Sequence, residues 1–221
     1  MADDRSMTNT PTPLQTTAKP PRKTQATDTQ ERALSAFLGY WNSMRRDGDV
    51  PLRTHIDPRG IEDLLGQAFV AERVAPGFAR LRIAGAHLSE LMGMEVRGMP
   101  LSTFIDPPDR EKLTDALVEL FERPATVRLE LTAPGNLRRP ALTGTLMILP
   151  LRSDLGDISR ALGCLVSSGT IGPAPRRFRI SSMTCTPLDR IEQNPHGNDS
   201  SPQAPANHPS ERPWLRLVHT T

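Results

Sequence analysis

The sequence predicts an α+β fold, with a five-stranded antiparallel sheet, helices on one face and a preceding N-terminal amphipathic helix. Residues 78–84 alternate arginine with apolar side chains, which is the period-2 pattern of a half-buried strand. Gly85 ends that pattern, and the apolar residues Leu88, Leu91 and Met92 then follow helical spacing. Two strand patterns near the start and three near the end enclose the helical ones. This order is typical of a sheet with helices segregated to one face.

An amphipathic helix is expected before the sheet, over residues 31–46. Asp28 offers an N-cap acceptor with Glu31 three residues later, a variant of the capping box, and Gly48 is placed to end the helix. The helix carries an apolar stripe at helical spacing: Leu34, Phe37, Leu38, Trp41 and Met44. Either its own domain or a second copy of the chain must cover this stripe. Its width leads us to expect a homodimer, in which the helix packs against its counterpart or against the partner's sheet.

The elements of the sheet are separated by turn residues. A connector with Pro51, Pro58 and Gly60 contains one or two helical turns, and Pro76-Gly77 joins the first two strands as a hairpin. The five strands are expected at residues 67–74, 78–84, 125–133, 141–151 and 158–168. The helical segments between them are expected at 86–92, 101–104 and from Asp106, as cap, to Arg123.

Composition divides the chain into one domain and two tails. Residues 1–28 and 171–221 are poor in Leu, Ile, Val and Phe, so they cannot bury enough apolar area to offset the entropy of ordering. We expect both to be largely disordered, the second also being Pro-rich, and residues 29–170 to form the domain. Two apolar islands, 178–180 and 214–218, are exceptions that can dock on an exposed face or edge of the sheet.

Charge and targeting signals limit the possible partners. The formal net charge of +2 is too small to indicate a polyanionic partner, so nucleic acid is not expected. The N-terminus has no apolar core of a signal peptide, and no stretch approaches the ~18 apolar residues of a membrane span. We therefore expect a cytoplasmic protein. Its two cysteines form neither a disulfide framework nor a metal-spaced cluster.

Several fragments, in their order and spacing, resemble a family of small stand-alone bacterial PAS proteins with no fused output domain. The fragments are Trp41-Asn-Ser-Met-Arg45, Pro51-Leu-Arg53, Ile56-Asp57-Pro58, Arg82-Ile-Ala-Gly85, Leu91-Met-Gly93, Glu95-Val-Arg97-Gly98 and Pro150-Leu151. The resemblance covers roughly residues 35–170 and implies a PAS fold and a sensor or interaction module. One departure is that such proteins tend to place Thr, a capping residue, after the Arg-x-x-Gly turn. This chain has Ala86 and His87 there.

The resemblance also requires a check for haem and flavin, which PAS sensors often bind. Haem-binding PAS domains typically offer a His from the long helix, and residues 106–123 contain none. Photoreactive flavin domains need a Cys in the segment before that helix, and residues 91–108 contain none. We therefore expect no cofactor and no metal.

A ligand pocket is expected between the inner face of the sheet and the helix 106–123. Its expected lining is almost wholly apolar, so a ligand would be small and hydrophobic: Phe69, Leu81, Ile83, His87, Leu88, Leu91, Phe104, Leu117, Phe121, Leu129, Leu146 and Val166. The alternative is a well-packed core with no cavity.

Isolated polar and reactive residues each have a structural interpretation. His87 is either a haem ligand or pH sensor, or more simply a hydrogen-bonding residue at a helix start. Cys164 fits a small buried hydrophobe better than a reactive thiol. The basic pairs Arg138-Arg139 and Arg176-Arg177 fit solvated loop charge. A further set fits ion pairs that anchor the leading helix to the sheet: Arg45, Arg53, Asp57 and Arg82.

No nucleophile triad, phosphate-binding glycine loop or HExxH motif is present. The leading hypothesis is thus a non-catalytic PAS sensor or adaptor that acts through contacts with a regulatory protein partner, with or without a small hydrophobic ligand as switch. One alternative is a small-molecule-processing enzyme of cone-like α+β fold, with His87 or Asp106 inside its cavity. The other is a weak nucleic-acid-binding adaptor that uses the basic loops and the tails.

Overall fold

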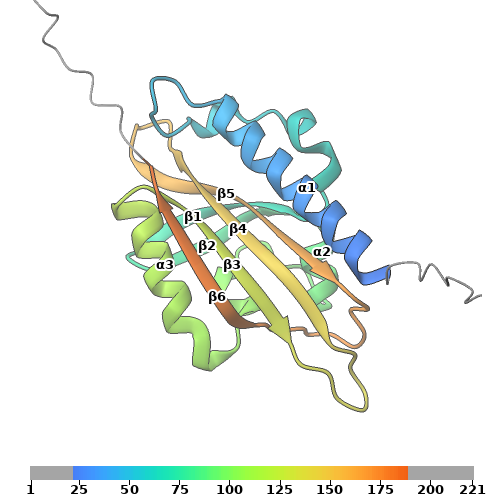
Figure 1. Cartoon of the computed structure of the whole chain (residues 1–221). Helices are drawn as coiled ribbons and strands as arrows, with labels where there is room; N and C mark the ends of the chain where they lie inside the picture. Colours follow the sequence, from blue (N-terminus) through green and yellow to red (C-terminus); the bar gives the residue numbers. More distant parts are fainter. Residues whose placement is uncertain (1–21, 189–221) are drawn as a thin grey trace, which may run out of the picture. The chain divides into compact units, whose positions relative to one another are not determined.

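The computed structural model describes residues 22–188, with side chains from residue 28 onward. Blocks of helices and 3₁₀ turns are followed by blocks of strands, in the order expected of the sequence (Figure 1). The elements are α1 (Arg22–Ser43), η1 (Arg53–His55), η2 (Pro58–Leu64), β1 (Ala68–Ala75), β2 (Phe78–Ala84), α2 (Ala86–Met92), η3 (Leu101–Phe104), η4 (Pro107–Asp109), α3 (Arg110–Glu122), β3 (Ala125–Ala133), β4 (Leu142–Arg152), β5 (Ile158–Ser168) and β6 (Arg179–Pro187).

The strands form a single antiparallel sheet in the order β2-β1-β5-β4-β3-β6. Five of them lie where the sequence predicts, three with identical bounds and two shifted by one residue. The prediction of five strands is wrong in number, because β6 adds a sixth along β3. The predicted helix 86–92 and the turn 101–104 are confirmed as α2 and η3.

The sixth strand corrects the domain boundary that we placed at residue 170. Phe178 and Ile180 are 0% and 5% exposed, and the Ile180 N–H donates to Asp109 Oδ2 at 3.1 Å. The apolar island at 178–180 therefore completes the core and docks on the sheet edge, as its composition allowed. The second island, 214–218, lies outside the described residues.

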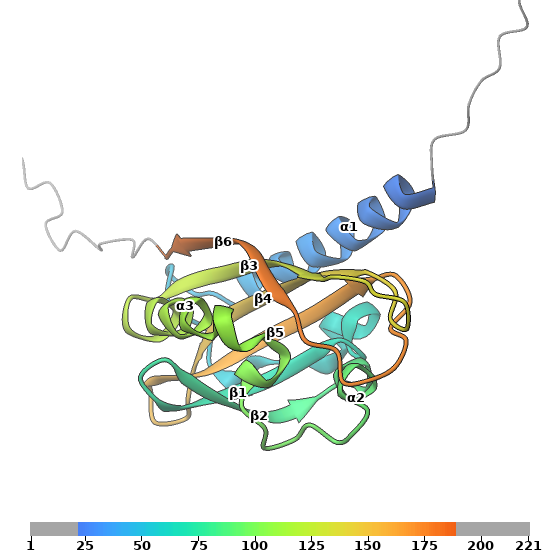
Figure 2. The same ribbon diagram turned by 90° about the horizontal axis from the view of Figure 1, so that it is seen from below.

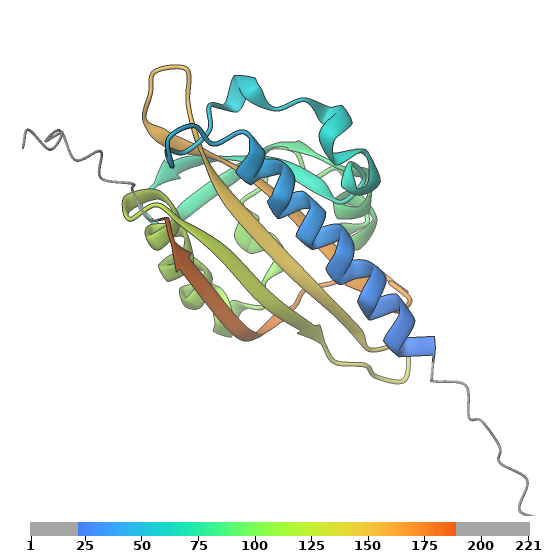
Figure 3. The ribbon, with the colours of Figure 1, turned by 45° about the horizontal axis from the view of Figure 1, so that its top comes forward.

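Helices cover both faces of the sheet, whereas the sequence led us to expect helices on only one face. The inner face is covered by α2, η3 and α3, and the outer face by α1 and η2 (Figures 2 and 3). Strand β5 is apolar on both sides as a result: Ala161 and Leu165 belong to the inner core, and Leu162 and Cys164 to the outer one. None of the helices in the described part of the chain has the length and apolar character of a membrane span.

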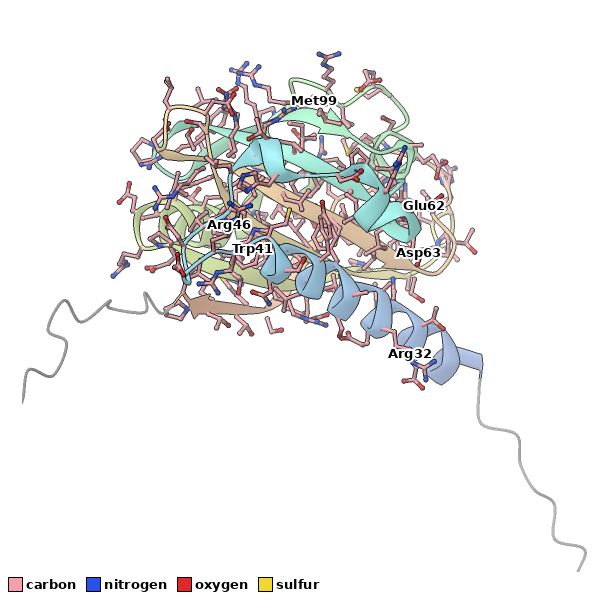
Figure 4. All side chains as sticks on the ribbon, turned by 90° about the horizontal axis from the view of Figure 1, so that it is seen from above. Arg32, Trp41, Arg46, Glu62, Asp63 and Met99 are labelled. Atoms are coloured by element: carbon pink, nitrogen blue, oxygen red, sulfur yellow. The ribbon has the colours of Figure 1, made fainter. Side chains whose placement is uncertain are left out.

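Helix α1 begins before the predicted position and packs on its own sheet. It starts at Arg22, so Asp28 lies within it and is not its N-cap. Leu34, Phe37 and Trp41 are 1%, 2% and 0% exposed against the outer face, and Trp41 Nε1 donates to the Pro150 carbonyl at 3.0 Å. Figure 4 shows Trp41 between α1 and the sheet. Most of the stripe is thus covered within the chain, and homodimerisation stays a prediction.

Two helices on the inner side begin without a side-chain cap, and for Asp106 this corrects the expectation. The backbone of Gly85 precedes α2 without a side-chain cap, which fits the lack of a capping residue at Ala86. Asp106 makes no capping hydrogen bond either, and its two following prolines form the 3₁₀ turn η4 ahead of α3. Proline is tolerated in a first turn, because its missing N–H has no helical acceptor there.

Candidate ligand-binding site

Most of the expected pocket residues form the inner core. Nine of them are at most 4% exposed and belong to one apolar cluster: Phe69, Leu81, Leu88, Leu91, Phe104, Leu117, Phe121, Leu129 and Leu146. The Phe69 ring lies directly over Gly163, where an added Cβ would be 2.2 Å from the ring. These side chains occupy the region in which the sequence places a ligand. Here the structure shows tight apolar packing.

Ile83 and Val166 do not belong to this core, which corrects two of the expected lining residues. A β-bulge causes the first error: Val70 pairs with Ile83 and Ala71 with Leu81, so Arg82 is an extra residue in β2. Ile83 consequently lies beside Val70 on the outer face and is 52% exposed. Val166 packs under α1 with the outer cluster. Its strand is apolar on both sides, and alternation alone cannot assign its face.

His87 acts as a link between α2 and the sheet. Its side chain is 15% exposed, its Nε2 lies 3.0 Å from Ser167 Oγ, and its Nδ1 lies 3.8 Å from a carboxylate oxygen of Glu90. Burial lowers the pKa of His87, which the charge of Glu90 opposes. This arrangement agrees with the hydrogen-bonding interpretation.

Cys164 and Arg176 are buried within the domain, whereas Arg138 and Arg177 of the basic pairs are exposed. Burial raises the pKa of Cys164 to about 12, so the thiol is protonated and unreactive. Arg176 corrects the expectation of solvated loop charge, because it is 2% exposed and donates to the carbonyls of Ile171 and Pro140. The described residues contain no cluster of three or more His, Cys, Asp or Glu that could hold a metal.

The anchoring ion-pair set expected for the leading helix is wrong. Arg45 donates to the carbonyls of Gly48 and Asp49 and lies over the Trp41 ring. Helix α1 is instead tied to the sheet by an ion pair between Glu31 and Arg128. Arg82 of the expected set pairs with Glu72 of the neighbouring strand. Hydrogen bonds from Arg160 and, to a smaller extent, from Arg82 lower the pKa of Glu72.

An apolar cavity of about 310 Å³ lies on the outer face. The sequence analysis did not place a pocket there, although two of its expected lining residues, Phe69 and Ile83, line this cavity. The connector η1–η2 forms one wall, with Ile56, Ile61 and Leu65. Strands β1, β2 and β5 form the other, with Val70, Ile83 and Leu162. The volume is at the lower end of the range that accommodates small ligands. We call this space the outer cavity. Leu65 and Ile83, which are 48% and 52% exposed, line this cavity. The sequence could have indicated the position of Ile83 only if the bulge in β2 had been known.

A second recess of about 430 Å³ adjoins the outer cavity, and the two share Arg53, Val70 and Ile83 as lining. The recess has a rim of four arginines, which we call the arginine rim: Arg53, Arg82, Arg97 and Arg160. It also contains two carboxylates, those of Glu72 and Asp154. Apolar space and positive charge thus meet at one opening.

The wall formed by the connector is bonded to α1. The Tyr40 hydroxyl donates to the Asp57 carbonyl at 2.9 Å and accepts from the Asp57 N–H at 2.7 Å. The Tyr40 ring lies so close to Gly60 that an added Cβ would be 2.0 Å from it. Ile61 and Leu64 of η2 pack in the same outer cluster as Phe37. These contacts join the connector to α1.

Comparison with known proteins agrees with this architecture. A family model described as PAS domain matches residues 29–166. Because the match spans more than half of the chain, the protein belongs to the PAS domain family. PAS domains are in general sensory and non-catalytic. No curated protein matches the chain.

Solved structures with detectable similarity include light-oxygen-voltage (LOV) domains. The light state of the blue-light photoreceptor Aureochrome1 LOV matches with a TM-score of 0.35 and 13% identity, over 50% of this chain and 88% of that one. A LOV domain studied with a flavin analogue matches with a TM-score of 0.37 and 18% identity, over 50% and 83%. An RNA-binding LOV receptor matches with a TM-score of 0.35 and 19% identity, over 53% of this chain and 36% of that one.

The residues of the inner core bear on whether a flavin fits this chain. Residues 86–109 contain no cysteine for an adduct, and the cluster between the sheet, α2 and α3 consists of apolar side chains. The prediction that the chain carries no flavin or haem rests on these residues and stays a prediction.

Proposed function

We propose that this PAS domain is a non-catalytic sensor in which a small ligand in the outer cavity repositions the connector η1–η2 and, through it, α1. The observation that carries the proposal is the double hydrogen bond between Tyr40 and Asp57. It connects the wall of an apolar cavity to the helix that covers the same face of the sheet. The output is a protein contact, made by α1 or its surroundings with a regulatory partner or with a second copy of the chain.

The lining of the cavity supports binding over catalysis. Its walls are mainly apolar, and neither His87 nor Asp106, the residues that the enzyme hypothesis requires, contributes to them. Acid–base chemistry needs a titratable group within hydrogen-bond reach of the reacting atoms. A sensor needs only a ligand that binds one arrangement of the connector more tightly than another.

The test measures the binding of a neutral apolar probe, 1-decanol, to the full chain by isothermal titration calorimetry at several temperatures, which also gives the heat-capacity change of binding. We expect binding to the native protein and slower hydrogen exchange in residues 53–65. The variant Ile83→Trp should occlude the cavity and abolish binding. Met94→Trp is the matched control, because Met94 is 55% exposed and does not line the cavity. Equal binding by both variants would place the probe elsewhere and overturn the proposal.

A further inference from the structure

The arginine rim gives the outer cavity a second specificity besides apolar character. Four guanidinium groups and two carboxylates line the recess, which leaves two positive charges in excess. The recess opens beside the apolar walls, since Arg53 and Ile83 line both spaces. A ligand that fills the cavity therefore has one end on apolar side chains and the other on arginines.

Two of the four arginines are available to a ligand. Arg53 and Arg97 take part in none of the ion pairs formed by residues 28–188. Both are exposed, so their guanidinium groups are hydrated and can turn toward an incoming anion. A guanidinium presents five N–H donors in a planar fork that matches a carboxylate or phosphate.

The other two arginines share one carboxylate. Glu72 accepts from Arg160 with one oxygen and from Arg82 with the other. Each of these guanidinium groups is left with donors that Glu72 does not use. The second carboxylate of the recess, that of Asp154, repels an anion, but the recess holds four arginines against two carboxylates. The pairing also fixes Arg82 and Arg160 beside the opening, which lowers the entropy cost of using them.

We propose that the ligand is an amphiphilic monoanion, a carboxylate with a medium-length alkyl chain, whose headgroup binds Arg53 and Arg97 while its chain fills the outer cavity. This inference rests on the proposed ligand-sensing function. Charge complementarity selects the anion, because a cationic amphiphile would meet the excess positive charge. The apolar walls select the chain, because a small inorganic anion leaves them in water.

The experiment compares three probes by calorimetry at about pH 7.5, where a carboxylic acid is ionised. Decanoate should bind about tenfold or more tightly than decanol, and acetate should not bind measurably. Only decanoate should lose affinity as salt is raised from low to high concentration. The double variant Arg53→Gln/Arg97→Gln should abolish the preference for decanoate, so that decanoate and decanol bind the variant with equal affinity.

The matched control is Arg46→Gln/Arg138→Gln, which removes the same charge from two arginines outside the recess. It should leave decanoate binding unchanged. If decanol binds and decanoate binds no better, the anionic ligand is rejected and the proposed function stands. If neither probe binds the native protein, the proposed function itself fails. Flotation with phosphatidylglycerol vesicles distinguishes a free carboxylate from a membrane lipid as the ligand. Binding to vesicles that depends on Arg53 and Arg97 would overturn the proposal that the ligand is a soluble carboxylate.

Discussion

The Tyr40 hydroxyl serves as donor and acceptor to a single residue, Asp57, seventeen positions later in the chain. The ring of the same tyrosine lies over Gly60. Tyr40 belongs to α1 and Asp57 precedes η2, so one side chain couples the helix to the wall of the outer cavity. Both hydrogen bonds are exposed, so water competes for them.

Tyr40→Phe is expected to loosen the connector with little loss of fold. It removes the hydroxyl and keeps the ring, so the free energy of unfolding should fall by about 1 kcal/mol. Amide exchange in residues 57–64 should quicken. Ser43→Ala is the control, because it removes an exposed hydrogen bond to Tyr40 O within α1 alone. Equal exchange rates in the connector of both variants would show that Tyr40 does not hold it.

A pair of glycine substitutions tests the packing of the inner core. Gly163→Ala should destabilise the protein by about 1–3 kcal/mol, because the new methyl group collides with the buried Phe69 ring. Gly39→Ala should stabilise it by up to about 1 kcal/mol, because Gly39 lies within α1 with nothing within 4 Å of an added Cβ. Urea denaturation measures both. A neutral Gly163→Ala would mean that the space over β5 is open and can take a ligand.

Sequence periodicity predicted the elements of this fold well and the faces of two residues badly. Segments such as α2 and β3 are flanked by clear punctuation, Gly85 and Pro124, and each has one buried face. The bulge at Arg82 is different, because a single extra residue reverses the face of Ile83 and leaves no mark on the apolar pattern. Val166 lies in a strand that is apolar on both sides. The outer cavity depends on both features, which explains why the sequence directed attention to the inner face.

The strand β6 was missed for a different reason. Only Ile180 within it is buried, and an edge strand with one exposed face carries little apolar signal. A chain that ends at residue 170 should therefore be unstable, since burial of Phe178 and Ile180 contributes about 1.5–3 kcal/mol each. A chain that ends at residue 188 should melt within a few degrees of the full chain. Thermal unfolding followed by circular dichroism compares the two shortened chains with the full chain. A stable 1–170 chain would show that β6 is not needed for the stability of the domain.

The role of α1 in dimerisation can be separated from its role in folding. Trp41→Ala should cost about 3–5 kcal/mol, because Trp41 is fully buried against the sheet of its own chain. Charged residues at Phe37 and Trp41 should thus unfold the protein and yield no folded monomer.

Leu38 of α1 and Met44, one residue beyond its end, are partly buried and remain candidates for contact with a second copy. If α1 forms the expected homodimer, Leu38→Glu/Met44→Glu should halve the mass by light scattering and keep the circular dichroism spectrum. A folded double variant of unchanged mass would reject this face as the interface.

The last prediction concerns the pH dependence of stability, which His87 should dominate near neutrality. Burial holds the pKa of His87 below the value of about 6.5 that histidine has in the unfolded chain. The unfolded state therefore binds more protons as the pH falls past that value, and the native state loses stability from there downward. The carboxylates with lowered pKa, such as Glu72, act the same way only at much lower pH, below their ordinary value of 4.5.

The melting temperature should fall between about pH 7.5 and pH 5.5, and His87→Gln should reduce that fall, because glutamine can still hydrogen-bond to Ser167 but does not titrate in this range. His55→Gln is the control, since His55 is exposed and lies outside this contact. Melting curves of the three proteins across the pH range measure the effect. Parallel curves for the native chain and His87→Gln would show that protonation of His87 does not oppose folding, and that its environment is more hydrated than the packing between α2 and β5 implies.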